Sequence, residues 1–191
     1  MRLRGIVFGF LALGAGGGLL ARGATRIGVH QGYAPEQPIA FPHKVHAGDN
    51  KIACLYCHSA ARTSRHAGIP SASVCMNCHA LLEKQTTAIQ RLKEAVQQER
   101  PIAWTKVHNL PDFVYFNHSQ HVLGGVACQT CHGPVEQMDR IEQAAPLTMG
   151  WCLGCHRAEA HVPTSTFARV AANVRGRPTP FAGEDCTSCH Y

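Results

Sequence analysis

All ten cysteines of this 191-residue chain lie in five copies of one pattern, Cys-x-x-Cys-His, and no cysteine is left over. Two thiols three residues apart lie on the same side of a single helical turn. The histidine that follows is then placed to bind the iron of a porphyrin that both sulfurs hold, which is the attachment signature of c-type haem. The predicted attachment cysteines are Cys54, Cys57, Cys75, Cys78, Cys128, Cys131, Cys152, Cys155, Cys186 and Cys189, and the predicted proximal iron ligands are His58, His79, His132, His156 and His190.

Two other uses of paired cysteines explain this pattern less well. Structural zinc sites also contain Cys-x-x-Cys, but they need no histidine after every pair and commonly take two pairs each, whereas this chain has five. Disulfides within the pairs would leave the five histidines unexplained. We therefore predict five covalently bound haem c groups as the cofactors of this chain.

The composition is consistent with an interior filled by cofactors. Only 7% of the residues are aromatic and 16% are charged, and 18 glycines and 11 prolines interrupt regular structure. We therefore expect a mainly α fold with much irregular structure and a haem-filled core in place of a large side-chain core. The formal charge of +6 falls to about +1 once each ferric haem with two ionised propionates adds about −1. A nucleic-acid partner is therefore not expected.

The N-terminus predicts a membrane anchor. A stretch of 17 residues without a charge begins at Gly5, behind a basic flank, and no Ala-x-Ala cleavage site follows it. We expect a single membrane helix within residues 1–27 and a haem domain over residues 28–191 outside the cytoplasm, where c-type haem attachment is completed. The small-x-x-x-small spacing of the glycines in this stretch favours packing against another helix, although glycine is common in membrane helices generally.

The haem domain contains a repeat. Phe41-Pro-His43-Lys-Val-His46 returns 75 residues later as Phe116-Asn-His118-Ser-Gln-His121, and the cysteine pairs that follow keep nearly the same offset. This predicts a duplicated two-haem module, with one copy over about residues 38–80 and the other over about 101–158. Apolar residues at a helical period predict a linker helix over about 81–100, stopped by Pro101. We expect a terminal segment, residues 159–191, to hold the fifth haem, with an extended loop over residues 158–184 before its cysteine pair.

A haem iron that only transfers electrons needs a second axial ligand. His43, His46, His118 and His121 are the predicted distal ligands because isolated histidines would not recur at a constant offset. In each pair the first histidine would serve the haem just downstream and the second a neighbouring haem. For the fifth iron three candidates stay open, namely His108, Met149 and His161, and methionine would raise the reduction potential. The remaining two histidines, His30 and His66, are predicted to be non-ligands.

Three strings of residues resemble a known family. Residues 39–51, 107–121 and 147–152 are similar to segments of the pentahaem cytochrome c subunit of alternative complex III, and the wider pattern resembles the class III multihaem cytochromes c. The resemblance implies a complex in the bacterial cytoplasmic membrane that oxidises quinol. This chain would lie on the periplasmic face beside an iron–sulfur subunit and multi-span membrane subunits. It would pass electrons to a periplasmic acceptor such as a monohaem cytochrome c, a copper protein or a terminal oxidase.

The expected role is an electron relay without a catalytic site, because six-coordinate irons have no open position for a substrate. A free-standing membrane-anchored quinol dehydrogenase, or a carrier feeding a periplasmic reductase, is the alternative. A multihaem reductase would instead need one five-coordinate iron. We also expect the terminal haem, on Cys186 and Cys189, to lie at an edge of the array, as an entry or exit point.

Overall fold

The computed structural model describes residues 2–24, 26–82, 86–157 and 185–191, with side chains from residue 13 onward. Apart from a 23-residue N-terminal helix, this part of the chain consists of short helices joined by long irregular segments. Its only strand-like pairing is one antiparallel bridge between Val114 and His190. The fold is therefore mainly helical and largely irregular, as the composition predicts. In order the elements are α1 (Arg2–Ala24), η1 (Lys44–Asp49), α2 (Cys54–Cys57), η2 (Ser59–Arg62), α3 (Ala72–His79), α4 (Thr87–Gln97), α5 (His118–Leu123), α6 (Cys128–His132), η3 (Val135–Gln137), α7 (Met149–His156) and η4 (Cys186–Ser188).

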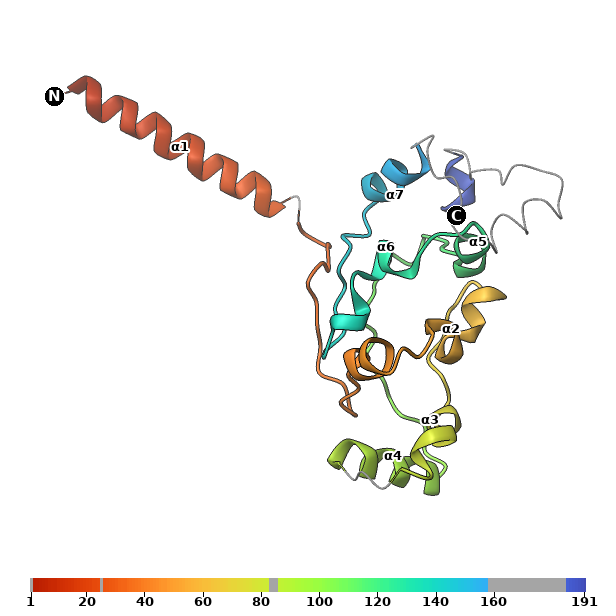
Figure 1. Ribbon diagram of the computed structural model, residues 1–191. Coiled ribbons are helices and arrows are strands. Elements are labelled where there is room, and N and C mark those ends of the chain that lie inside the picture. The colour runs from red at the N-terminus through yellow and green to blue at the C-terminus, as the bar shows by residue number, and fades with distance from the viewer. Residues whose placement is uncertain (1, 25, 83–85, 158–184) are drawn as a thin grey trace.

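Helix α1 stands away from the rest of the chain (Figure 1). Its leucines from residue 13 onward, Leu13, Leu19 and Leu20, are each more than 70% exposed. The described residues include no helix whose length and apolarity would allow it to cross a bilayer. The membrane anchor within residues 1–27 thus stays a prediction.

The five cysteine pairs lie on short helical turns, as expected. Helices α2, α3, α6 and α7 each contain one pair, and η4 contains the start of the fifth. The longer turn α7 begins at a cap, where Thr148 Oγ1 accepts a hydrogen bond from the Trp151 N–H at 3.3 Å. The helical turn on which each pair lies therefore sets the relative position of its two sulfurs.

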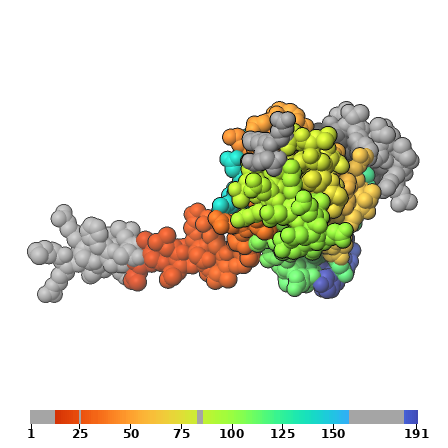
Figure 2. All heavy atoms as spheres, turned by 90° about the horizontal axis from the view of Figure 1, so that it is seen from below, coloured from red at the N-terminus to blue at the C-terminus, as the bar shows by residue number. Residues whose placement is uncertain are grey.

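The predicted linker helix is shorter than expected, and its boundaries over 81–100 are corrected to Thr87–Gln97. It begins late because Thr86 Oγ1 accepts a hydrogen bond from the Ile89 N–H, which caps the helix at that residue. It ends before Pro101 because Glu99 adopts a left-handed conformation, with φ of 50°. Leu92 and Ala95 form its buried face. Helix α4 and the segment after it cover one end of the molecule (Figure 2).

The two predicted modules interlock through backbone hydrogen bonds. Turn η1 of the first packs on η3 of the second, where the Lys44 N–H donates to the Met138 carbonyl at 2.9 Å. Helix α5 of the second packs on η2 of the first, and the Ser119 N–H donates to the Ser64 carbonyl at 3.1 Å. Each module therefore holds part of the other's histidine-bearing segment.

Side chains alone fill little of the interior. Among the described residues the buried apolar side chains are few and mostly small, namely Ile39, Ala61, Leu92, Ala95, Val107 and Ala145. Cysteine is among the residue types most often buried, yet none of the ten cysteines is fully buried. This leaves apolar and sulfur-bearing surface for a large apolar group to cover.

Among the residues that the structure describes, one polar side chain is more deeply buried than any apolar one. Gln143 is 1% exposed, and its side-chain oxygen accepts a hydrogen bond from the Asn109 N–H at 3.0 Å. Its side-chain nitrogen donates to the Ala145 carbonyl, and its backbone exchanges two hydrogen bonds with Gly32 and Tyr33. Gln143 thus joins three segments that are distant in sequence, and no sequence pattern singled it out.

A glycine pair tests how tightly the second module is packed. Gly133 and Gly68 share a φ of 71°, but a Cβ on Gly133 would lie 2.6 Å from the Ala144 Cβ, whereas a Cβ on Gly68 meets nothing within 4 Å. We expect Gly133→Ala to lower the free energy of unfolding by roughly 2–4 kcal/mol, since steric overlap adds to backbone strain. Gly68→Ala should cost only about 1 kcal/mol. Thermal unfolding of the haem-loaded variants measures both, and equal losses would contradict the packing.

Candidate haem-binding site

The two Phe-x-His-x-x-His segments adopt the same local geometry. In the first, the Phe41 ring meets His43 edge-on, with ring centres 4.9 Å apart, and stacks on His46 at 4.2 Å. In the second, Phe116 meets His118 edge-on at 4.8 Å and stacks on His121 at 4.4 Å. The phenylalanine therefore fixes the orientation of two histidines at once, which explains why it recurs with them.

Backbone carbonyls hold one nitrogen of several of these imidazoles. His46 Nδ1 lies 3.0 Å from the Pro42 carbonyl, and His121 Nδ1 lies 2.8 Å from the Asn117 carbonyl at the same offset. His118 Nδ1 donates in the same way to the Arg65 carbonyl, and the proximal His58 Nδ1 to the Gly68 carbonyl. A hydrogen bond at Nδ1 leaves Nε2 unprotonated and available to a metal.

Three distal candidates face proximal histidines at one common spacing. Metal–imidazole bonds of about 2.0–2.1 Å on both sides of one ion place the two ring centres roughly 6 Å apart. The observed ring centres lie 6.1 Å apart for His46 and His79, 6.3 Å for His118 and His132, and 6.1 Å for His121 and His156. The spacing of these three pairs fits an iron between two imidazoles.

The remaining candidate of the repeated segments, His43, lies near His58 of the first haem motif. Burial lowers the pKa of His43 to about 4, and the nearby His58 adds to the effect. The His43 Nδ1 is buried without a hydrogen-bond partner, and so is the Nδ1 of His79. Burial likewise lowers the pKa of His132 to about 4, with His108 the strongest contributor after burial. The imidazoles of His43 and His132 are therefore neutral at pH 7, which is the form that binds iron.

The cysteine pairs follow one another in space in an order that differs from the sequence. Burial raises the pKa of Cys131 to about 11, and the adjacent Cys155 and Cys152 thiols raise it further, so the third and fourth motifs are neighbours. Burial also raises the pKa of Cys57, Cys128 and Cys152. In each case a thiol of another motif raises it further, namely Cys78 beside Cys57, Cys54 beside Cys128, and Cys189 beside Cys152.

The proximity of these thiols places the five motifs in one series. Their order is 75–79, 54–58, 128–132, 152–156 and 186–190. Figure 1 shows the same succession, with α3 and α4 at one end of the molecule, α2 and α6 between, and α7 and the C-terminal turn at the other end. The terminal motif thus stands at one end of the series, next to α7.

The terminal motif is held by the segment just before α5. The Tyr115 N–H donates to the Cys189 carbonyl at 2.7 Å, beside the bridge from Val114 to His190. The Phe113 ring stacks on His190 with ring centres 5.8 Å apart. The last haem motif therefore packs against the second module through a backbone hydrogen bond and a ring contact.

The three candidates for the fifth distal ligand have different surroundings. His108 Nε2 lies 3.1 Å from His132 Nδ1, with ring centres 4.4 Å apart. Met149 begins α7, one turn before Cys152, and is 60% exposed. His161 lies outside the described residues. Of the predicted non-ligands, His30 has its ring edge against Tyr33 and His66 is exposed.

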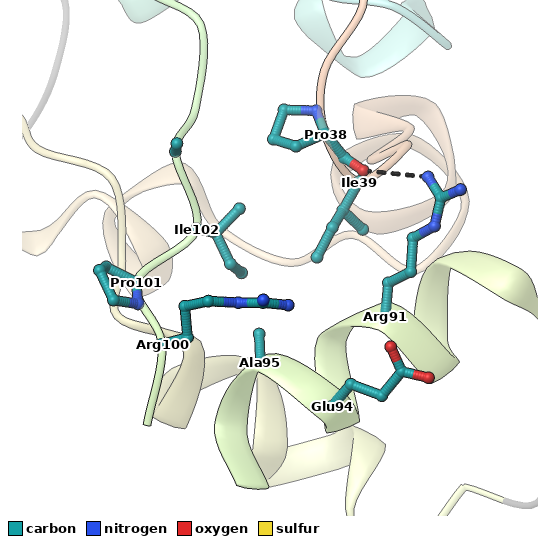
Figure 3. A pocket seen from close by; sticks show the side chains of 9 residues that line it. Pro38, Ile39, Arg91, Glu94, Ala95, Arg100, Pro101 and Ile102 are labelled. Atoms are coloured by element: carbon teal, nitrogen blue, oxygen red, sulfur yellow. Dashed lines mark hydrogen bonds between the residues drawn. The ribbon is translucent and has the colours of Figure 1, made fainter. Parts of the chain in front are cut away.

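A surface cavity of about 440 Å³ lies at the α4 end, outside the haem motifs. Arg91 and Ala95 of α4 line one side, with Ile39 and Ile102 opposite (Figure 3). Arg91 donates a hydrogen bond to the Pro38 carbonyl at 3.3 Å, which ties α4 to the start of the first module. Since no haem-motif residue lines it, the cavity belongs to the packing of α4.

Cysteine pairs on short helical turns, with histidines facing one another between them, are the features of a multihaem cytochrome c. The family model of cytochrome c7 and related cytochromes c matches residues 114–191. The multihaem cytochrome c subunit of menaquinone reductase from Nitratidesulfovibrio vulgaris is 30% identical over 148 residues, which covers 66% of this chain and 70% of the relative. The chain belongs to this cytochrome c7-like family of multihaem cytochromes c, and electron transfer through covalent haem is its function.

Proposed function

We propose that this chain is the electron-relay subunit of a membrane quinol-oxidising complex, close in type to the pentahaem subunit of alternative complex III. The observation that carries the proposal is the common spacing of 6.1–6.3 Å between three distal and three proximal imidazoles. Imidazoles on both faces of each iron leave no position at which a substrate could bind. The homologue's place in a menaquinone reductase supports a quinone-linked partner.

Bound haem supplies one-electron oxidation and reduction at each motif. The chain's own residues keep neighbouring motifs close: Cys78 lies near Cys57 at one end and Cys189 near Cys152 at the other. Carbonyl hydrogen bonds fix the imidazoles, so that a change of redox state needs little rearrangement of the protein. We propose that electrons enter at one end of this series of motifs and leave at the other.

The assembly follows from the same proposal. The chain would lie on the periplasmic side of the bacterial cytoplasmic membrane, with α1 directed to multi-span subunits. An iron–sulfur subunit would deliver electrons, and a small periplasmic redox protein or a terminal oxidase would receive them. The two modules that share Phe-x-His-x-x-His geometry would each hold two haems, and the C-terminal motif would hold the fifth.

The test is to isolate the chain with its native complex and to count its haems. A pyridine haemochrome assay should return five haems per chain, and the reduced native protein should not bind carbon monoxide. Quinol added to the complex should reduce these haems. Fewer than five haems, or stoichiometric carbon monoxide binding, would contradict the relay. Isolation without any membrane subunit would favour the free-standing carrier instead.

A further inference from the structure

His132 has two imidazole neighbours with different geometry. The His118 ring is nearly parallel to it, with an interplanar angle of 14° and ring centres 6.3 Å apart. The His108 ring meets it at 75°, with ring centres only 4.4 Å apart. The first spacing accommodates an iron between the rings, but the second does not, because two metal–imidazole bonds need roughly 6 Å.

The shorter contact, between His108 and His132, is a hydrogen bond between two ring nitrogens. His108 Nε2 lies 3.1 Å from His132 Nδ1, the distance of a hydrogen bond. His132 must bind iron through the nitrogen that is not in this bond, so its Nδ1 carries the proton and donates it. His108 Nε2 is then the acceptor, and the same nitrogen cannot also bind an iron.

The backbone around His108 is held firmly. Val107 is buried, and the N–H of Asn109 donates to the side-chain oxygen of the buried Gln143 at 3.0 Å. His108 is itself half-buried. The acceptor is thus fixed against His132 by residues on both sides of it.

From this geometry we propose that His108 is a positioning residue for the haem at His132, and not the fifth distal ligand. The proposal rests on the proposed function, since it concerns the haem in the middle of the series. An imidazole that donates from Nδ1 gains basicity at Nε2. A more basic ligand stabilises ferric iron, so the contact lowers the reduction potential of that haem.

The experiment compares His108→Phe and His108→Gln in the full complex. His108→Phe keeps a ring of similar size but removes the acceptor, whereas the glutamine side-chain oxygen can still accept a hydrogen bond. We expect five low-spin haems in both variants. In His108→Phe the potential of one haem should rise, with about a tenfold increase in its reduced-to-oxidised ratio at a fixed potential, or about 59 mV for one electron. His108→Gln should restore most of the difference.

The shifted haem can be assigned by ferric EPR, because the near-parallel rings of His118 and His132 and the near-perpendicular rings of His121 and His156, at 83°, give different signals. His66→Leu, at an exposed histidine, is the matched control and should leave every potential unchanged. His108→Leu removes the same acceptor with a smaller side chain, should the phenylalanine not fit.

Two results would overturn the proposal. A high-spin, carbon monoxide-binding haem in His108→Phe or His108→Leu would show that His108 is an axial ligand. Unchanged potentials with five low-spin haems would show that the hydrogen bond has no influence on the iron. Either result leaves the relay itself intact, because the relay depends on the haem count and coordination of the unmodified protein.

Discussion

Replacing His118 with alanine should open one iron of the series to external ligands. His118 lies opposite His132 with ring centres 6.3 Å apart, and its Nδ1 is held by the Arg65 carbonyl at 2.8 Å. Without this imidazole the haem at Cys128 and Cys131 would keep its thioether bonds and its proximal ligand but lose the distal one. We expect one of five haems to become high-spin and to bind one equivalent of carbon monoxide in the reduced state.

The same variant should also interrupt the relay. The motif at residues 128–132 lies in the middle of the series, between the motifs at 54–58 and 152–156. Visible absorption, carbon monoxide titration and electron delivery to an external acceptor are the measurements. His30→Ala is the control, because His30 is a predicted non-ligand whose ring packs against Tyr33. A variant that stays fully low-spin would show that another side chain occupies the distal position.

Replacing His121 with methionine should raise the reduction potential of the haem at His156. The His121 ring faces His156 with centres 6.1 Å apart and stacks on Phe116 at 4.4 Å. Methionine is flexible enough to fill this space, and its sulfur is a weaker donor to ferric iron than an imidazole nitrogen. Since axial ligands set haem potentials over a range of about 0.8 V, we expect a rise on the order of 0.1 V.

A redox titration followed at the haem absorption bands measures this rise. The control is His66→Met, which introduces the same side chain at an exposed position. The rise should appear in one haem and leave the other potentials nearly unchanged. A high-spin signal instead would mean that methionine does not reach the iron. A titration identical to that of the unmodified protein would contradict the assignment of His121 as a ligand.

Much of the site could be predicted because its chemistry is local. A cysteine pair and its histidine lie within one or two helical turns, so their spacing alone specifies a haem attachment site. The Phe-x-His-x-x-His segment is equally local, since Phe116 contacts both His118 and His121 within six residues. The repeat therefore predicts the distal histidines without knowledge of the fold.

The α4 boundaries were harder to predict. Apolar residues continue the helical period back to Leu82, but the hydrogen bond from Ile89 to Thr86 begins the helix later. A side-chain cap competes with the helical backbone at its own position, and hydrophobic period does not detect it. The burial of Leu92 and Ala95 agrees with the pattern inside the corrected helix.

The amino-acid sequence by itself determined which residues form the haem-attachment pattern and which histidines recur with it, because these patterns join near neighbours in the chain. Only the tertiary structure decided which histidine faces which, the order of the motifs in space, and the place of His108 against His132. Those arrangements depend on Gln143 and on the interlocking turns between the modules, contacts that join residues far apart in sequence. A fold with few buried apolar side chains has no strong hydrophobic period from which such long-range contacts could be inferred.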